Sequence, residues 1–257
     1  MKARVLLYDI ETAPILGTAW GKWEQNLVWI VKDWYMLTFA YKWLGEKKTH
    51  VLGLPDFKTY SKDPENDIEL VKALRELFDE ADVVIAHNGN SFDQKKSQAR
   101  MVLNGLTPPS PYQQIDTKLV ARRYFSFTSN SLNDLGRELK CGQKLDTGGY
   151  DLWRSCLAGD PKAWKKMKKY NKQDVVLLEE VYLKLLPWIN SHPPMNSILH
   201  RPTACPKCGG PKMIAGVKYT SSKTGVRHQY FRCNGCGGVA KARMAEQLSK
   251  DERNLYV

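Results

Sequence analysis

An apolar run near the N-terminus ends in two carboxylates, and it constrains the fold more than any other stretch of the sequence. Residues 3–9 read Ala-Arg-Val-Leu-Leu-Tyr-Asp, and Glu11 follows Asp9 after one intervening residue. Because the run is nearly continuous rather than alternating, it predicts a strand that is buried on both faces of a sheet. Side chains two apart on a strand point to the same face, so we expect Asp9 and Glu11 to project together.

Two adjacent carboxylates with no basic residue between them repel each other unless a cation holds them. Carboxylate oxygens suit hard divalent ions such as Mg²⁺ or Mn²⁺, so Asp9 and Glu11 predict a metal site at the end of this strand. The alternative interpretation is a strand that ends in an acidic turn. The choice between the two depends on whether the rest of the chain supplies partners for the pair.

The segments that follow predict an α/β fold. Two strands joined by a turn come next and give an antiparallel start of three strands. A helix with an apolar stripe then leads into a short β-branched strand, which we expect to be central and parallel. Ser91 and Ser131 are the expected N-caps of two later helices. The predicted strands lie at 36–44, at 49–54, at 82–86 and around Ile115, and the predicted helices at 67–78, 91–104, 131–140 and 170–187.

Two other stretches are expected to be loops. Residues 13–33 are irregular and contain Trp20, Trp23 and Trp29. We expect this segment to pack over the sheet, and the alternative is that its tryptophans stack on the bases of a substrate strand. The polar stretch 142–150 is expected to be an exposed loop.

Two patterns supply candidate partners for the first carboxylate pair. The sequence from His87 to Asp93 reads His-Asn-Gly-Asn-Ser-Phe-Asp, which places Asp93 in the first turn of a helix at the mouth of the preceding strand. The alternative role of Asp93 is to stabilise the N-terminus of that helix. Tyr170 and Asp174 are four residues apart and share one face of a late helix, where both can contact one water. The alternative is that Tyr170 belongs to the core.

The charge of the chain favours a polyanionic partner. Its 257 residues contain 39 Lys and Arg against 27 Asp and Glu, which gives a formal net charge of +12. Nucleic acid therefore comes ahead of small acidic metabolites as the expected partner. Six lysines lie between residues 162 and 172. They either gather backbone phosphates at the site or form a solvated helix face.

No stretch approaches the ~20 apolar residues of a membrane span, and the N-terminus lacks a secretion signal, so we expect a cytoplasmic protein that does not enter a membrane.

Four cysteines near the C-terminus form two Cys-x-x-Cys pairs. In a reducing compartment such pairs indicate metal binding rather than disulfides. The pairs are Cys205 with Cys208 and Cys233 with Cys236, each followed by Gly-Gly. They resemble a zinc ribbon, and four thiolates suit one structural Zn²⁺.

The acidic patterns together resemble a known family. They match, in order and spacing, the three motifs of the DEDD (DnaQ-like) 3'-5' exonucleases of the DEDDy type, in the ribonuclease H-like superfamily. The first two are most similar to the proofreading domain of the family B DNA polymerases. The matching patterns are Asp9-x-Glu11, Asn88-x3-Phe92-Asp93 and Tyr170-x3-Asp174.

This resemblance implies a ribonuclease H-like fold, a mixed β-sheet with helices on both faces. It also implies that Asp9, Glu11, Asp93 and Asp174 hold two divalent ions, Mg²⁺ or Mn²⁺, which clamp the attacking and leaving oxygens of the scissile phosphate. Tyr170 would then orient the attacking water. The domains expected on this basis are an exonuclease domain at 1–190, a linker at 191–202 and a zinc ribbon at 203–257.

The function expected from the sequence is therefore a 3'-5' exonuclease that acts on DNA, on single-stranded or frayed ends, alone or with a replication or repair partner. A 3'-5' exoribonuclease is the nearest alternative, because the same carboxylates cut either polymer. A nucleic-acid-binding protein with a vestigial nuclease fold is a second, although it would not need all four carboxylates and the tyrosine. A transposase-like nuclease is a third, and the pattern Tyr170-x3-Asp174 disfavours it.

Overall fold

The computed structural model describes residues 3–24, 26–221 and 226–247, and it divides into two compact units. One unit runs from Arg4 to Tyr182, and the other contains the chain from Leu183 onward. The domain boundaries expected at 190 and 203 remain predictions. Among the described residues, no helix is both long and apolar enough to cross a membrane.

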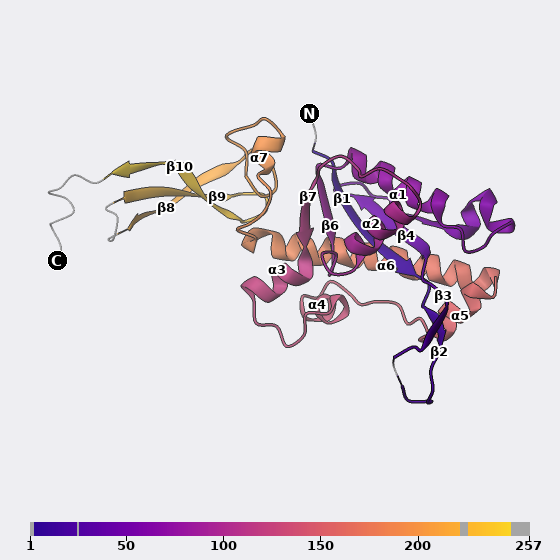
Figure 1. Cartoon of the computed structure of the whole chain (residues 1–257). Helices are drawn as coiled ribbons and strands as arrows, with labels where there is room; N and C mark the ends of the chain where they lie inside the picture. Colours follow the sequence, from indigo (N-terminus) through magenta and orange to yellow (C-terminus); the bar gives the residue numbers. More distant parts are fainter. Residues whose placement is uncertain (1–2, 25, 222–225, 248–257) are drawn as a thin grey trace. The chain divides into compact units, whose positions relative to one another are not determined.

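A five-stranded mixed sheet forms the centre of the first unit (Figure 1). Its order is β5-β4-β1-β6-β7, in which β1 pairs antiparallel with β4 and parallel with β6. The strands are β1 (Val5–Thr12), β4 (Met36–Trp43), β5 (His50–Gly53), β6 (Val83–Ala86) and β7 (Gln113–Asp116). The sheet confirms the predicted fold class, including the antiparallel arrangement of β1, β4 and β5 and the inner, parallel position of β6.

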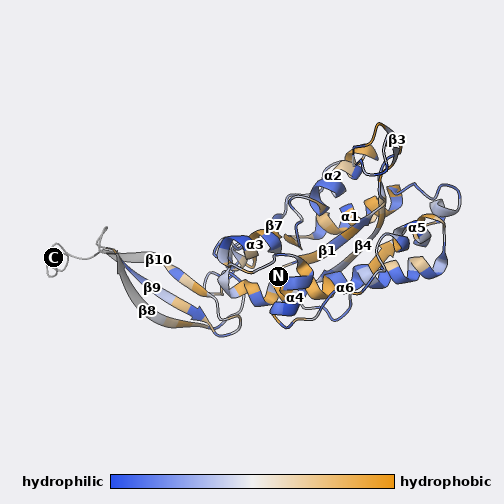
Figure 2. Cartoon of the chain, turned by 90° about the horizontal axis from the view of Figure 1, so that it is seen from below, coloured by the Kyte–Doolittle hydropathy of each residue, from blue (hydrophilic) through white to orange (hydrophobic). Residues whose placement is uncertain are grey.

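Helices cover both faces of this sheet. In both views α1 and α2 lie on one side and α6 on the other, and α6 carries hydrophilic and hydrophobic residues along its length (Figures 1 and 2). The helices are α1 (Ile68–Glu80), α2 (Asp93–Leu103), α3 (Thr117–Tyr124), α4 (Leu132–Glu138), α5 (Asp151–Leu157) and α6 (Pro161–Leu185), with 3-10 turns at Leu54–Asp56 and Lys58–Ser61. The apolar stripe predicted for α1 is buried at Leu70, Val71, Leu74 and Phe78 and partly buried at Leu77.

The alternation of side chains along β1 decides which face carries the carboxylates. Tyr8 points toward α1, where its ring packs edge-on against Phe78 with the centroids 5.0 Å apart. Its neighbour Asp9 points to the opposite face and meets Asn171 of α6. Glu11 shares that face with Asp9 because it lies two residues further on.

The N-cap predicted for α2 is wrong, and that predicted for α4 is confirmed. Phe92, not Ser91, precedes α2, because the turn after β6 is one residue longer than expected. Asn88 adopts a left-handed φ of 68°, and its carbonyl accepts the amides of both Ser91 and Phe92. Ser131 caps α4 by accepting the amide of Asp134.

The prediction that the tryptophans of residues 13–33 pack over the sheet is wrong. This segment contains a separate two-stranded ribbon, β2 (Leu16–Thr18) and β3 (Trp29–Lys32). Trp20, Trp23 and Trp29 are 86%, 87% and 69% exposed. The two strands pair with each other and so satisfy their backbone hydrogen bonds away from the central sheet.

The second unit is built on a three-stranded antiparallel sheet in the order β10-β9-β8. Its elements are a 3-10 turn (Leu186–Trp188), α7 (Met195–Ile198), β8 (Met213–Ser221), β9 (Val226–Cys233) and β10 (Val239–Gln247). α7 lies inside the segment expected to be a linker, and the amide of Met195 donates to the carbonyl of Pro206 at 2.9 Å.

Candidate active site

Three of the predicted carboxylates meet between β1 and α6. Asp9, Glu11 and Asp174 each offer an oxygen within 4.8 Å of the other two. A β-bulge between Glu11 and Thr12 turns the end of β1 at this point, and such bulges often lie beside functional sites. Asp174 is fully buried, and its Oδ1 has no hydrogen-bond partner in the described part of the chain. A buried carboxylate oxygen without a donor is well suited to bind a cation.

Asn171 fixes the position of Asp9, and the sequence analysis did not identify it. Its Nδ2 donates to Asp9 Oδ2 at 2.6 Å and to the Asp9 carbonyl at 3.2 Å, while its Oδ1 accepts from Thr38 Oγ1 at 2.9 Å. The side chain is fully buried. Asn171 therefore links α6 to β1 and β4 beside the carboxylates. Its position next to Tyr170 was the only signal in the sequence.

Asp93 lies beside this group rather than inside it. It is the first residue of α2, it is 3% exposed, and its Oδ1 accepts the amide of Ile10 at 3.2 Å. The turn that delivers it is held by Asp116, whose carboxylate accepts the amides of Asn88 and Asn90. Asp93 is thus anchored to β1 immediately next to Asp9 and Glu11.

The carboxylates resist ionisation because they are buried together. Burial, with the charge of Asp174 next in importance, raises the pKa of Glu11 to about 8. Burial outweighs the hydrogen bond from Ile10 and raises the pKa of Asp93 to about 7. The pKa values of Asp9 and Asp174 are also raised, chiefly by burial. A group of this kind gains stability from a bound cation.

Lys144 supplies a positive charge from the loop that was predicted to be exposed. Its Nζ lies 2.6 Å from Asp174 Oδ2 and 3.1 Å from the hydroxyl of Tyr170. Burial opposes its charged form, but the carboxylates of Asp174 and Asp9 outweigh that effect and raise its pKa. The prediction for 142–150 is therefore wrong at Lys144. A lone lysine in a polar loop carries no sequence signal of such a role.

Tyr170 lies where the sequence placed it, on the face of α6 that carries Asp174. Burial, followed by the charge of Asp174, raises the pKa of its phenol above the usual value, so it stays protonated at neutral pH. Its ring packs against Trp153 of α5, with the centroids 6.3 Å apart. The hydroxyl accepts a hydrogen bond from Lys144 Nζ, which also donates to Asp174, and from there it can orient a bound water.

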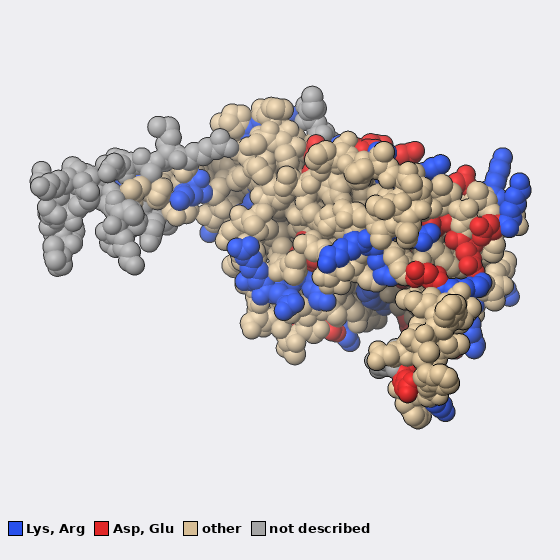
Figure 3. All heavy atoms as spheres, viewed as in Figure 1, with Lys and Arg blue, Asp and Glu red and all other residues tan. Residues whose placement is uncertain are grey.

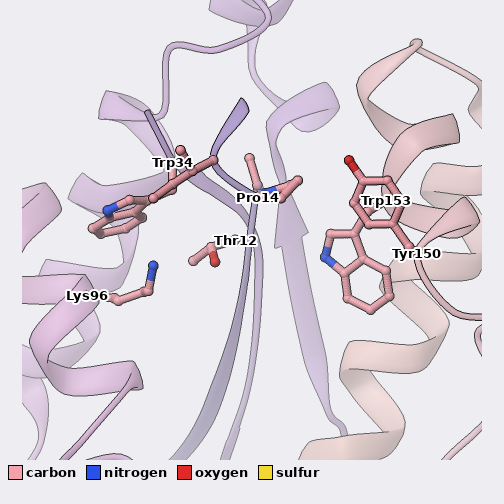
Figure 4. A pocket seen from close by; sticks show the side chains of 8 residues that line it. Thr12, Pro14, Trp34, Lys96, Tyr150 and Trp153 are labelled. Atoms are coloured by element: carbon pink, nitrogen blue, oxygen red, sulfur yellow. The ribbon is translucent and has the colours of Figure 1, made fainter. Parts of the chain in front are cut away.

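A cavity of about 260 Å³ opens at the end of β1 (Figure 4), and one of its lining residues, Trp153, packs against Tyr170. Trp34 lies on one side with Lys96, whose Nζ is 3.7 Å from the centre of its ring, and Trp153 lies on the other. Thr12, between them, directly follows Glu11 in β1. The lining residues are Thr12, Ala13, Pro14, Ile15, Trp34, Lys96, Tyr150 and Trp153. Its walls thus offer aromatic faces together with one cation.

Four of the six lysines of residues 162–172 line a groove away from the carboxylates, whereas Lys166 lies on the face of Tyr170 and donates to the carbonyl of Thr147 at 2.9 Å. The groove has a volume of about 660 Å³ and is lined by Lys165, Lys168, Lys169 and Lys172, together with Lys48 of the β4–β5 turn. Lys172 lies two residues after Tyr170, which is about 200° around the helix. The groove is therefore on the side of α6 opposite to the one that carries the acidic group.

The four cysteines of the second unit form one cluster. Their sulfurs lie within 4.8 Å of one another, with Cys205 and Cys236 3.8 Å apart and Cys208 and Cys233 3.6 Å apart. Four sulfurs bound at 2.3 Å around one Zn²⁺ would be about 3.8 Å apart. The geometry is consistent with a zinc site.

Glycines shape the two cysteine loops. Gly209 and Gly237 adopt left-handed φ values of 72° and 75°. Each donates its amide to the carbonyl of the first cysteine of its pair, Cys205 or Cys233. A side chain would strain both turns, because L-residues other than glycine rarely adopt this conformation.

Residues 33–186 match the family model of the RNase H superfamily. The match covers more than half of the chain. The chain belongs to the RNase H superfamily. The matched part includes Asp93, Tyr170 and Asp174, whereas Asp9 and Glu11 lie before it. No curated protein matches the chain.

Among solved structures, this RNase H superfamily chain is similar to the family B DNA polymerase from the hyperthermophilic archaeon Pyrobaculum calidifontis. The TM-score is 0.55 and the sequence identity 16%, and the similarity covers 73% of this chain and 25% of the polymerase chain. At this identity the comparison shows a shared fold. The chain corresponds to about a quarter of the length of that polymerase.

Proposed function

We propose that this protein is a metal-dependent 3'-5' exonuclease that hydrolyses the phosphodiester bonds of DNA. The observation that carries the proposal is the convergence of Asp9, Glu11 and Asp174 within 4.8 Å, with Asp93 anchored beside them. The fold shared with a family B DNA polymerase favours DNA over RNA as the substrate.

The four carboxylates would hold two Mg²⁺ or Mn²⁺ ions, and the buried, unpartnered Oδ1 of Asp174 fits such a ligand. When bound, the ions would supply Lewis-acid stabilisation of the attacking and leaving oxygens at the scissile phosphate. Asn171 keeps Asp9 in place for this role. Lys144 orients both Asp174 and Tyr170, and it offsets part of the negative charge of the group.

Tyr170 orients the attacking water in this proposal. Its raised pKa makes it a poor base at neutral pH, so its protonated hydroxyl positions the water instead of deprotonating it. The cavity beside Thr12 would take the base at the 3' end of the strand, because bases stack on aromatic rings such as Trp34 and Trp153. Lys96 can then neutralise a nearby phosphate.

We also propose that Cys205, Cys208, Cys233 and Cys236 hold one structural Zn²⁺. The sulfur separations and the matched glycine turns support this proposal. The C-terminal unit would help to bind nucleic acid or a replication or repair partner. The expected cytoplasmic location remains a prediction.

The test uses 5'-labelled DNA and RNA of matched sequence, with and without Mg²⁺ or Mn²⁺. We expect a ladder of successively shorter labelled products from single-stranded DNA, only when the metal is added. A ladder of RNA products alone would assign an exoribonuclease. Metal-independent products, or none with any polymer, would refute the proposal.

A further inference from the structure

The β2–β3 ribbon exposes an apolar surface that the proposed chemistry does not use. In Figure 3 it projects as a lobe with few charged side chains. Besides Trp20, Trp23 and Trp29, its exposed apolar residues are Ile15, Leu16, Leu27, Val28, Ile30 and Val31. Exposed apolar surfaces of this kind often mark binding sites.

Both ends of the ribbon are fixed at the active site. The amide of Ala13 donates to the carbonyl of Tyr35 at 2.8 Å, which closes the base of the ribbon one residue beyond Thr12. Pro14 precedes the ribbon, Trp34 follows it, and both line the cavity at the end of β1 (Figure 4). The exposed surface is thus continuous with that cavity.

The ribbon has a defined shape of its own. The amide of Val28 donates to the carbonyl of Thr18 at 2.8 Å. A Cβ added to Gly17 would lie 2.5 Å from the carbonyl oxygen of Trp29 and 2.7 Å from a methyl group of Leu27. Only glycine allows this close approach, so the backbone of the ribbon is packed while its indoles remain outside.

The chemistry of the exposed side chains favours bases as their ligand. The two most exposed are both tryptophans, which offer flat faces for stacking. Lys22 Nζ lies 5.1 Å from the ring centre of Trp23, so a cation accompanies that ring. An aromatic ring beside a lysine suits a base and its phosphate better than it suits an apolar partner surface.

We propose that the β2–β3 ribbon is a stacking arm for the unpaired bases of a single strand whose 3' end occupies the cavity. This inference rests on the proposed function and extends it to the way in which the strand is held. The strand leaves the cavity along the ribbon, because the two surfaces are continuous. The ligand is therefore single-stranded nucleic acid several nucleotides long.

The test measures binding by the full chain in an Asp9→Asn background without catalysis. The probes are labelled oligothymidylates of about 4 and about 16 nucleotides. We expect the double change Trp20→Leu and Trp23→Leu to weaken binding of the longer probe about tenfold, which is the loss of roughly one stacked base. Binding of the shorter probe should stay the same. The double change to Phe should keep the affinity, because it keeps an aromatic face.

Two controls make the result interpretable. Val102→Ala on α2 removes an exposed apolar side chain elsewhere and should leave binding unchanged. In the parent chain, the longer probe should also protect tryptophan fluorescence from an added quencher, and this readout needs no substitution. The stacking arm would be overturned if the Leu variant bound the longer probe as tightly as the parent chain, or if the Leu and Phe variants lost the same affinity. It would also be overturned if the longer probe did not protect tryptophan fluorescence from the quencher.

The outcome is separable from that of the proposed function. If the protein cuts DNA but the Leu variant binds the longer probe as tightly as the parent chain, the exonuclease proposal stands and the stacking arm is refuted. If the protein cuts no polymer but the Leu variant binds the longer probe more weakly, the stacking arm stands and the exonuclease proposal is refuted.

Discussion

Lys144 and Asn171 hold the carboxylates in opposite ways. Asn171 is neutral and fixes Asp9 through a buried hydrogen bond, whereas Lys144 offers a charge to Asp174. Both contacts join residues that are far apart in the sequence. Asn171 and Asp9 are 162 residues apart, and Lys144 and Asp174 are 30 residues apart. Composition and periodicity describe only near neighbours, so neither contact could be predicted. The carboxylates themselves could be predicted, because Asp9, Glu11 and Asp93 lie at the ends of recognisable elements and Asp174 follows Tyr170 by one helical turn.

Replacing Lys144 with alanine should slow single-turnover cleavage at neutral pH about tenfold, because Asp174 and Tyr170 lose a charge-assisted hydrogen bond. The rate should recover as the pH rises, since without Lys144 the pKa of Asp174 rises further. A pH profile of the single-turnover rate measures both effects. Lys162→Ala, at an exposed position of α6, is the matched control. A profile identical to that of the parent chain would show that Lys144 has no role in the site.

The raised pKa values of Glu11 and Asp93 predict how stability depends on pH without added divalent ions. Both groups are still protonated in the folded chain at a pH where the unfolded chain has released those protons, because their pKa values are about 8 and 7. Folding is therefore favoured at low pH, and the free energy of unfolding should fall as the pH rises from about 5 to about 8.

Chemical denaturation across this pH range provides the measurement. Asp9→Asn should flatten the decline, because it removes a carboxyl group whose own pKa is raised by burial and by the charges of Asp93 and Glu11. Added Mg²⁺ should restore stability at pH 8. A decline as steep in Asp9→Asn as in the parent chain would contradict the coupling among these carboxylates.

At the scale of elements, regular patterns were predictable and irregular segments were not. The apolar run of β1 and the apolar stripe of α1 both face the core, so the spacing of apolar residues in each predicts which side chains are buried. The β2–β3 ribbon has no such period, because both of its faces are exposed. Trp29 and Ile30 point to opposite faces and are both exposed, and no alternation marks that arrangement.

Helix α6 has an acidic face and a basic face. On the face with Tyr170 and Asp174, Asp174 is fully buried and Tyr170 is partly buried, whereas the face with Lys165 and Lys169 lines the groove. The double change Lys165→Gln and Lys169→Gln should therefore leave the single-turnover rate at saturating DNA unchanged. Rapid-quench kinetics with short single strands provide the measurement. A lower rate at saturation would place these lysines at the scissile phosphate after all.

At the scale of the whole molecule, the two units divide the work in our account. The first contains all the carboxylates that the chemistry needs, and the second contains the cysteine cluster. The double change Cys205→Ser and Cys208→Ser should release the zinc, measured by elemental analysis, because two ligands are lost. The second unit should then unfold, since small metal-binding units fold with their metal.

The same change should weaken DNA binding and make it less sensitive to salt, because each lost phosphate contact lowers the slope of log affinity against log salt by about 0.7 to 0.9. The single-turnover rate at saturation should not change. Loss of that rate with intact secondary structure would show that the second unit contributes to the active site. Unchanged affinity and slope would assign the second unit to a protein partner.

The central claim is that the acidic group between β1 and α6 performs metal-dependent cleavage from the 3' end. Its most direct test is the single-turnover rate of Asp9→Asn on 5'-labelled DNA with Mn²⁺, compared with Glu138→Gln, which changes an exposed carboxylate on α4. We expect the first change to lower the rate about a hundredfold or more, as is typical when a group that stabilises transition-state charge is lost. The second should leave the rate unchanged. Equal rates in the two purified variants would contradict the account.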